Sequence, residues 1–313
     1  MTAALIVAAG RTGSKAQLAP EKKTGMITAI ERVALLFQQA GIRRIVVVCD
    51  GDGVKKLAPS MNLTFLTSPI GGEMLDSVKT GLAYLQGKCR RAFISYVDVP
   101  LFSLRTVRAL LDAGGGAAVP SYNGRGGHPI LLEAAVFGSV LSYTGGDGLK
   151  GAIDASGVER RFVAVDDPGI VSDIQKDDSY ESLLPGHDAA KLRAAFQFRI
   201  CRECVFYGPR AHQLLQLTRE LGSLSDACRH MGISYSKGRK IIANMERQMG
   251  GPVIETQQGG KGGGGSRLTQ RAAELMERYD AFCLEAEDAL QVLFQKHFAT
   301  QSDEVRRTEG SGL

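Results

Sequence analysis

Hydrophobic residues in the first half of the chain form short continuous runs that alternate with longer amphipathic segments. The runs, rich in β-branched residues, are Ala3–Ala8, Arg44–Cys49 and Ala92–Val97. The amphipathic segments are Met26–Ala40, Glu73–Leu85 and Leu104–Ala113. Such runs indicate buried parallel strands, and the segments between them indicate crossover helices. The pattern therefore predicts an α/β doubly wound, mostly parallel sheet that ends near residue 184.

Beyond about residue 207 the pattern changes to short helices and a glycine-rich segment. The predicted helices are Pro209–Leu221, Ser223–Met231 and Ser234–Met249, and a serine N-cap opens each of the last two. Gly232 permits a sharp turn between them. Six of the seven residues 259–265 are glycine, so we expect a hairpin tip rather than a helix. This layout is that of an all-α winged helix-turn-helix domain.

A long helix is expected from Thr269 to about Phe298. Its apolar residues share one face: Ala272, Met276, Tyr279, Cys283, Ala286, Leu290 and Leu293. Such a stripe suits a partner helix, so we interpret it as a dimerisation helix. The predicted division is a sheet domain at 1–184, a linker at 185–206, the winged helix-turn-helix at 207–268, the dimerisation helix at 269–300 and a disordered tail at 301–313.

Length and composition are those of a two-domain soluble globular protein. The chain has 313 residues, of which 44% are hydrophobic and 23% charged, and each half is long enough to bury a core. No segment approaches the roughly 18 consecutive apolar residues of a membrane span, and no basic region precedes the first apolar run. We therefore expect a cytoplasmic protein without membrane contact.

The six cysteines are scattered along the chain, without the dense spacing of a disulfide scaffold. One close pair stands out, Cys201 and Cys204. Either the pair serves metal or redox chemistry, or the two cysteines are incidental at a domain junction. A zinc site would need further ligands, and the nearest histidine, His212, stands alone.

Positive charge is concentrated in the predicted helix-turn-helix region. Residues 200–269 hold ten Lys and Arg against five Asp and Glu, whereas residues 270–313 hold five against nine. A local surplus suggests a polyanionic partner. The second helix of the pair carries groove-reading and phosphate-contacting residue types in its N-terminal half. The candidate DNA-binding residues are Ser234, Tyr235, Ser236, Lys237, Arg239, Lys240, Asn244 and Lys261.

The same region resembles a known family of regulators. GSLSDACRHMGISYSKGRKIIANMERQMG and GGKGGGGSRLT are similar to the DNA-binding domain of the molybdate-responsive ModE regulators, over about residues 207–285. The resemblance implies a homodimer on double-stranded DNA, held partly by the long helix, with each copy reading a half-site. The molybdate-binding domains of that family have no counterpart here, so we expect sensing to reside in the N-terminal half. The alternative is a helix-turn-helix that makes protein contacts only.

Candidate ligand chemistry in the first half lies in loops that follow predicted strands, where doubly wound sheets bind their ligands. Glycines after the first run let backbone N–H groups approach phosphates, and Arg11, Lys15, Lys22 and Lys23 add positive charge. The loop lacks the Gly-Lys-Ser/Thr of a Walker A motif. Asp98, after the third run, could hold Mg²⁺ against a triphosphate, and an aspartate there is also a common turn former.

A series of segments places these loops in a second resemblance. ALIVAAG, ERVALLFQQAGIRRIVVV, MLDSVKTGL, YVDVPLF, PSYNGRGGHPILL and DGLKGAI occur in an order similar to that of MobA-like nucleotidyltransferases, especially molybdenum-cofactor cytidylyltransferases, over about residues 2–184. The resemblance implies a Mg²⁺-dependent enzyme in which a phosphate of molybdopterin attacks a nucleoside triphosphate. It assigns Asp98 to the metal, and Lys22 and His128 to catalysis. The implied nucleotide-binding residues are Ala9, Gly10, Arg11, Gly13, Ser14, Lys15 and Ser77, with Gly81 nearby.

Several charges of that family are absent. Counted without gaps, Ser14 and Ala19 stand where the family has Arg and Lys. Gly126 stands where the family has an Arg before Gly-His-Pro, and Gln175 stands where the family has a second acidic metal ligand. Each lost charge can lower a phosphoryl-type transfer rate by about 10² to 10³. A loop shift that brings Lys22 into the place of the missing lysine would compensate in part.

Three functions are compatible with these observations. The first is a DNA-binding regulator whose transferase fold has become a sensor for a nucleotide or a pterin. The second is a bifunctional enzyme and regulator that still makes a dinucleotide form of the molybdenum cofactor. The third uses the transferase-like fold for protein contact only. Binding of Mg²⁺ and triphosphate separates the first two from the third, and turnover separates the second from the first.

Overall fold

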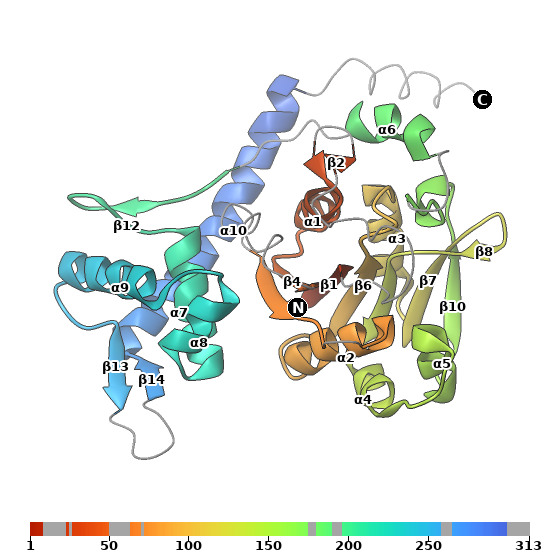
Figure 1. Cartoon of the computed structure of the whole chain (residues 1–313). Coiled ribbons are helices and arrows are strands. Elements are labelled where there is room, and N and C mark those ends of the chain that lie inside the picture. Colours follow the sequence, from red (N-terminus) through yellow and green to blue (C-terminus); the bar gives the residue numbers. More distant parts are fainter. Residues whose placement is uncertain are drawn as a thin grey trace. The chain divides into compact units, whose positions relative to one another are not determined.

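The apolar runs of the first half are neighbouring strands of one sheet (Figure 1). The computed structural model describes residues 1–8, 23–24, 27–49, 63–69, 72–174, 180–189, 196–257 and 265–298. Strand β1 (Thr2–Ala8) pairs in parallel with β4 (Arg44–Cys49) on one side and with β6 (Arg91–Tyr96) on the other. The bounds of all three strands agree with the predicted runs to within one residue, which confirms this part of the prediction.

Further strands extend the sheet on both sides. They are β5 (Thr64–Thr67), β7 (Ala117–Tyr122), β8 (Arg125–Gly126), β9 (Ile130–Glu133) and β10 (Arg160–Ala164). The order across the sheet is β10-β7-β9-β6-β1-β4-β5, with β8 paired to β7. Strand β9 is antiparallel to both of its neighbours, whereas β1, β4, β5 and β6 are mutually parallel, as are β7 and β10. The sheet is therefore mixed but mostly parallel, as predicted.

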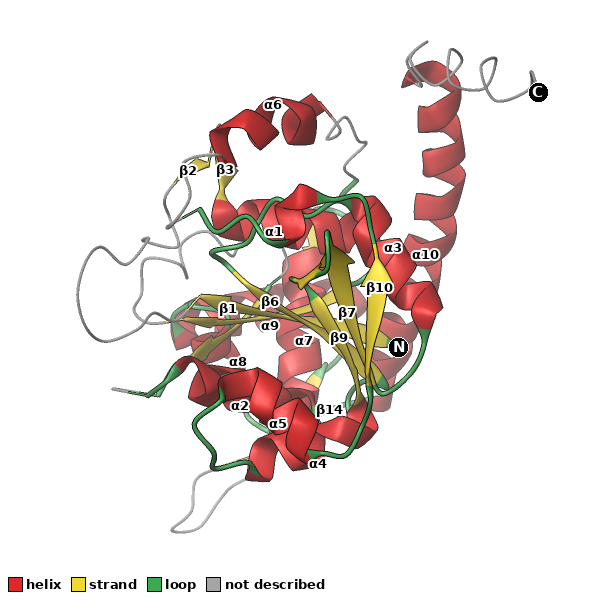
Figure 2. Cartoon of the chain, turned by 90° about the vertical axis from the view of Figure 1, so that its right-hand side faces the viewer, coloured by secondary structure: helices red, strands yellow, loops and turns green. Residues whose placement is uncertain are grey.

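Helices cover both faces of this sheet, as Figure 2 shows. The chain divides into two compact units, the first of residues 1–190 and 230–232, and the second of residues 191–229 and 233–313. The helices of the first unit are α1 (Ala29–Gln39), α2 (Met74–Leu85), α3 (Leu104–Ala113), α4 (Ala134–Ser142), α5 (Gly148–Ala155) and α6 (Tyr180–Ala189). Apolar residues of α1, α3 and α6 pack on one face, and those of α2, α4 and α5 pack on the other. Burial on both faces explains why these strands read as continuous apolar runs rather than as alternating ones.

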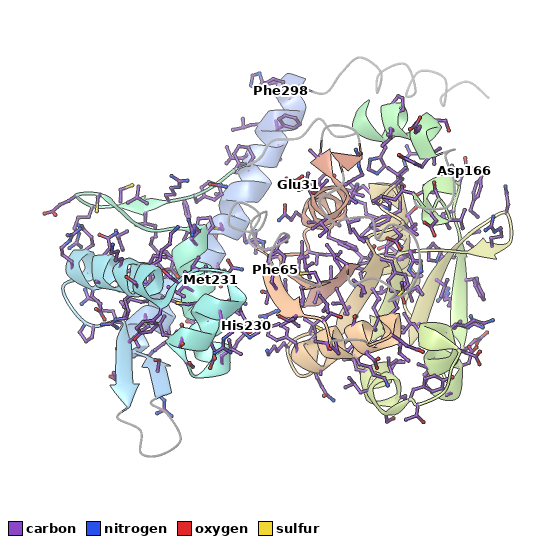
Figure 3. All side chains as sticks on the ribbon, in the orientation of Figure 1. Glu31, Phe65, Asp166, His230, Met231 and Phe298 are labelled. Atoms are coloured by element: carbon purple, nitrogen blue, oxygen red, sulfur yellow. The ribbon has the colours of Figure 1, made fainter. Side chains whose placement is uncertain are left out.

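The start of α1 shows how local sequence sets the element bounds. A small hairpin of β2 (Lys23–Thr24) and β3 (Ile27–Thr28) precedes the helix. The Thr28 hydroxyl accepts the backbone N–H of Glu31 (3.2 Å), and the Glu31 carboxylate accepts the backbone N–H of Thr28 (2.7 Å). This capping box starts α1 at Ala29, after the predicted start at Met26; Glu31 is labelled in Figure 3.

The segment predicted to be a linker at 185–206 has structure of its own. Its first residues, from Pro185, continue α6 to Ala189. The ring of His187 bridges two elements of the first unit, since Nδ1 lies 2.9 Å from Nη1 of Arg32 and Nε2 lies 3.0 Å from the carbonyl oxygen of Phe102. These tertiary contacts stabilise a helix that the composition Pro-Gly-His-Asp disfavours. The linker prediction therefore fails for residues 185–189.

Three helices of the second unit agree with the predicted bounds to within one residue at each end. They are α7 (Pro209–Leu221), α8 (Leu224–His230) and α9 (Tyr235–Met249). The predicted serine caps are confirmed, because the hydroxyl of Ser223 accepts the N–H of Asp226 (3.2 Å) and that of Ser234 accepts the N–H of Lys237 (3.3 Å). Gly232 has a φ of 62°, a left-handed conformation that favours glycine in the turn between α8 and α9.

Two hairpins and a long helix complete the second unit. Strands β11 (Ile200–Cys201) and β12 (Val205–Tyr207) form a hairpin that the sequence pattern did not reveal. Strands β13 (Ile254–Gln257) and β14 (Gly265–Leu268) form the predicted antiparallel pair, and the tip between them lies outside the described residues. Helix α10 (Gln270–Phe298) has the predicted length. No helix in the described part of the chain is long and apolar enough to span a membrane.

Candidate functional site

The carboxyl ends of β1 and β6 lie side by side at one edge of the sheet. Val7 is paired with Tyr96, and the N–H of Val97 donates to the carbonyl oxygen of Val7 (3.0 Å). Asp98, two residues beyond β6, is therefore held next to the point where β1 ends. This is the edge at which doubly wound sheets bind ligands. The predicted loop residues Ala9, Gly10, Arg11, Gly13, Ser14, Lys15 and Lys22 lie outside the described residues.

A second acidic residue belongs to the segment beside Asp98. The N–H of Ile174 donates to the carbonyl oxygen of Asp98 (2.9 Å). Asp173 immediately precedes Ile174, so this hydrogen bond keeps the backbone of Asp173 near that of Asp98. Gln175, the position that lacks the family carboxylate, lies outside the described residues. Two carboxylates together with phosphate oxygens are the donor set that Mg²⁺ prefers. Among the described residues, however, no group of three or more acidic, histidine or cysteine side chains could hold a metal by itself.

Asp167 fixes the shape of this edge, and the sequence analysis missed it. One carboxylate oxygen accepts the N–H of Ser103 (2.7 Å) and the hydroxyl of Thr106. The other accepts the N–H of Gly169 (3.0 Å). The residue is buried, so all three bonds are shielded from water. The Asp-Pro-Gly sequence at 167–169 signals a turn, but nothing local indicates that its carboxylate binds the loop after Asp98.

His128 lies on the other side of that turn, in the Gly-His-Pro segment. Its backbone N–H donates to the carbonyl oxygen of Ile170 (2.9 Å), and its ring centroid lies 4.5 Å from that of Tyr96. Although the residue is only half-buried, its Nδ1 atom is shielded from solvent and has no hydrogen-bond partner among the described residues. Burial lowers the pKa of His128 to about 4, against the opposing effect of a hydrogen bond to the Ile94 backbone. The imidazole is therefore neutral at pH 7.

The packing around His128 explains two glycines. A Cβ on Gly127 would lie 2.2 Å from the carbonyl oxygen of Ile170. A Cβ on Gly169 would lie 1.9 Å from the carbonyl oxygen of Leu101. Because real Cβ atoms do not approach backbone so closely, both positions need glycine to join the loop after Asp98, the Pro168–Ile170 turn and the Gly-His-Pro segment.

Ser77 and Gly81 have structural roles that the sequence analysis did not predict. The Ser77 hydroxyl is buried and lies 2.7 Å from that of Ser68, which follows β5 at the same edge of the sheet. A Cβ on Gly81 would lie 2.2 Å from a methyl carbon of Leu5, so this glycine lets α2 approach β1.

The second candidate site is the exposed face at the start of α9. The side chains that were predicted to contact DNA and are exposed here are Ser234, Tyr235, Ser236, Lys237, Arg239 and Lys240. Between them, Gly238 is buried against α8. Ala227, Ile242 and Met245 are fully buried, so α9 turns one face inward and its basic face outward. Lys261 lies outside the described residues.

Asn244 binds within the second unit. Its side-chain amide donates to the carbonyl oxygen of Val205 (3.0 Å), and its Oδ1 accepts from Arg247 (2.8 Å) and from the thiol of Cys204 (3.5 Å). It therefore ties the β11–β12 hairpin to α9. Asn244 was also predicted to contact DNA, which stays a prediction.

The apolar stripe of α10 divides into two parts. Its first four residues, from Ala272 to Cys283, are buried within the second unit. Of the other three, Ala286 and Leu290 are partly buried and Leu293 is 50% exposed. Val292 and Phe298, outside the stripe, are 70% and 56% exposed. The first part of the stripe is thus core, and the last turns of the helix present apolar side chains to solvent.

Comparisons with known proteins find two kinds of similar protein. Over 89 residues, 28% of this chain, the protein is 34% identical to the transcriptional dual regulator ModE of Escherichia coli, of which 34% is covered. The chain spans about a third of the length of the first ModE relatives. A nucleotidyl transferase structure from Methanothermobacter has a TM-score of 0.51 and 17% identity, over 61% of this chain and 99% of that chain. A manganese complex from Mycobacterium tuberculosis has a TM-score of 0.47 and 21% identity, over 59% and 97% of the two chains.

The mixed sheet, its two helical layers and the loop at Asp98 define an α/β domain of the nucleotidyltransferase fold. Residues 4–160 match the MobA-like NTP transferase domain family. The chain belongs to this family, and a stretch of 89 residues is similar in sequence to a ModE regulator.

Proposed function

We propose that this protein is a DNA-binding transcriptional regulator of the ModE type, in which the MobA-like domain acts as a ligand sensor linked to molybdenum cofactor metabolism. The observation that carries the proposal is the exposed basic start of α9, where Lys237, Arg239 and Lys240 all face solvent. A helix of this kind, preceded by a sharp turn and followed by a hairpin, is how winged helix-turn-helix domains enter the major groove of DNA.

A homodimer is part of the proposal. The exposed apolar residues of the last turns of α10, among them Val292 and Leu293, are suited to the same helix of a second copy. Two copies would place two α9 helices on successive half-sites of an operator. The identity to ModE proteins supports this arrangement.

Sensing rather than catalysis is favoured by the chemistry of the first unit. The family charges missing at Ser14, Ala19 and Gly126 would each have stabilised negative charge on phosphates. His128 adds no positive charge, because burial holds its pKa at about 4. Each missing charge lowers the transfer rate by about 10² to 10³, so the combined loss over several positions leaves ligand binding but little turnover.

The ligands of the sensor are a nucleoside triphosphate with Mg²⁺, and molybdopterin. Asp98 and Asp173 are the residues that would hold the metal, since their segments are hydrogen-bonded together at the ligand-binding edge. Mg²⁺ would neutralise phosphate charge there. His128, with its neutral imidazole, would border the acceptor.

An active transferase is the alternative, and one observation favours it. The fold keeps Asp98 at the carboxyl edge and keeps an acidic residue, Asp173, on the adjoining segment. With Lys22 in the place of the missing lysine, the domain would transfer a nucleotide from CTP or GTP to molybdopterin, and the same chain would regulate transcription.

DNA binding is tested with Arg239→Ala and Lys240→Ala. If these side chains contact phosphates, each change weakens binding by about tenfold and lowers the slope of log K against log salt by about one. Fluorescence anisotropy with duplex DNA at several salt concentrations measures both. Arg278→Ala, an exposed arginine on α10, is the matched control and should leave both values unchanged. Wild-type affinity and slope in both α9 variants would refute DNA contact by this helix.

Ligand binding is tested by titration calorimetry with CTP, GTP and ATP, with and without Mg²⁺. We expect one nucleotide to bind only with Mg²⁺, and Asp98→Ala to weaken that binding by at least about tenfold. Asp112→Ala, on the exposed face of α3, controls for loss of surface charge. Turnover with molybdopterin would favour the transferase over the sensor. No binding of any nucleotide would leave the domain as a protein-contact module and would refute both.

A further inference from the structure

The β11–β12 hairpin carries a pair of thiols at its tip. Cys201 ends β11 and Cys204 immediately precedes β12, and both are free and exposed. Cys201 is paired with Val205 in the hairpin register, and Cys204 immediately precedes Val205 in the chain. The N–H of Arg202 donates to the carbonyl oxygen of Cys204 (3.2 Å), which closes the turn between the two cysteines. The spacing is that of reversible disulfides in Cys-x-x-Cys motifs.

The thiol of Cys204 contacts three residues of α9. Its sulfur lies 3.5 Å from the amide nitrogen of Gln248 and 3.9 Å from Nη2 of Arg247, and both groups donate to it. The thiol itself donates to Oδ1 of Asn244 (3.5 Å). An amide and a guanidinium beside a sulfur are placed to receive negative charge on it, as nucleophilic thiols require.

The backbone of the hairpin tip is tied to the same helix. The N–H of Glu203 donates to the side-chain oxygen of Gln248 (3.3 Å), and the amide of Asn244 donates to the carbonyl oxygen of Val205 (3.0 Å). Residues 244, 247 and 248 lie on one face of α9 because they are three and four positions apart. The hairpin is therefore anchored to the C-terminal half of α9 through Cys204 and its two neighbours.

We propose that Cys201 and Cys204 are a redox modification site: a dithiol that low-molecular-weight disulfides convert to an intramolecular disulfide, which alters the hold of the hairpin on α9. In the first step one cysteine thiolate attacks a sulfur of the small disulfide, a mixed disulfide forms, and a small thiolate leaves. In the second step the other cysteine thiolate attacks the mixed disulfide, the Cys201–Cys204 bond forms, and a second small thiolate leaves. The protein loses two electrons and two protons, and the small disulfide is reduced to two thiols.

The other cysteines of the chain are poor competitors for this reaction. Cys49, Cys228 and Cys283 are buried, and Cys89 is half-buried. Burial raises the pKa of the Cys89 and Cys228 thiols, so little thiolate is present at neutral pH. Selectivity for the hairpin pair follows from exposure and from the donors on α9.

Disulfide formation changes the contacts of Cys204. A sulfur bonded to Cys201 has no proton, so it cannot donate to Oδ1 of Asn244. The hairpin then loses part of its attachment to α9. This effect on DNA rests on the proposed function, because it requires α9 to be the helix that reads DNA. Loss of one or two such hydrogen bonds corresponds to about fivefold to tenfold weaker DNA binding.

The site is tested on the full chain at defined ratios of reduced to oxidised glutathione, with peptide mass spectrometry as the readout. The wild type should lose two hydrogens from the peptide that contains Cys201 and Cys204. Cys201→Ser and Cys204→Ser should each stop at the mixed disulfide with glutathione, and Cys89→Ser should behave as the wild type. A wild-type peptide that stays reduced, or that holds glutathione without the internal bond, overturns the proposal. Stoichiometric zinc in the purified chain that is lost in Cys201→Ser also overturns it, in favour of a metal site.

DNA affinity of the reduced and oxidised chain tests the coupling. Oxidation should weaken binding in the wild type and should have no effect in the Cys201→Ser/Cys204→Ser double variant. Equal affinity of both wild-type forms overturns the coupling. If neither form binds DNA while the disulfide forms, the regulator function is refuted and the redox site is supported. If DNA binds and no disulfide forms, the redox site is refuted and the regulator function is supported.

Discussion

Replacing Asp167 by alanine should destabilise the first unit by about 3 kcal/mol. The carboxylate accepts the N–H of Ser103, the N–H of Gly169 and the hydroxyl of Thr106, and it is buried. Each such bond contributes about 1 kcal/mol or more, and the change to alanine leaves its donors in the protein interior without an acceptor. Hydrogen exchange of the peptides that cover β6, α3 and β7 measures the loss within the full chain.

The neighbouring residue provides the control for this prediction. Asp166, labelled in Figure 3, is exposed, so Asp166→Ala removes the same charge from the surface without opening the interior. Asp167→Asn keeps the shape but replaces one acceptor oxygen by a donor, which then faces another donor, and it should cost nearly as much. Because Asp167 holds the loop that begins at Asp98, both variants should also weaken nucleotide binding. Equal protection from exchange in Asp166→Ala and Asp167→Ala would contradict the structural role of Asp167.

The sequence predicted those elements in which a strong local pattern and burial agree. Three central strands and their crossover helices were found because burial on both faces makes the strands continuously apolar. Helices α8 and α9 were found because a serine caps each of them. Short elements, such as the β11–β12 hairpin, have neither a long apolar run nor a capping residue, and they were not predicted.

The errors arise where a tertiary contact decides the outcome. Residues 185–189 have a linker composition, yet His187 joins α6 to Arg32 and to the Phe102 carbonyl, and the helix continues. The bond between the Asn244 amide and the hairpin backbone was likewise not predicted, because it joins residues that are far apart in the sequence. The Asp98 loop was located correctly at the edge of the sheet, whereas Asp167, which holds it, acts across more than sixty positions of sequence and left only a turn signal.

Replacing Gly238 by alanine should destabilise the second unit, although alanine is the better helix former by about 1 kcal/mol. A Cβ at this position would lie 2.2 Å from the sulfur of Cys228, which is buried in α8. Overpacking of this kind costs up to about 3 kcal/mol, so the net loss should be about 1 to 2 kcal/mol. Hydrogen exchange of the α8 and α9 peptides should show it, and DNA binding should weaken because α9 is displaced.

The pair Gly238 and Cys228 allows a direct test of this cause. Once the sulfur is gone, the nearest other atoms to the new Cβ are Cβ of Cys228 at 3.9 Å and a methyl carbon of Leu214 at 4.0 Å, which are ordinary contacts. Cys228→Ala alone should be mildly destabilising, because it removes a buried sulfur. The double variant Gly238→Ala/Cys228→Ala should be more stable than either single variant, with a coupling of about 2 kcal/mol. Additive losses would mean that Gly238 is needed for backbone freedom rather than for the close approach of α9 to α8.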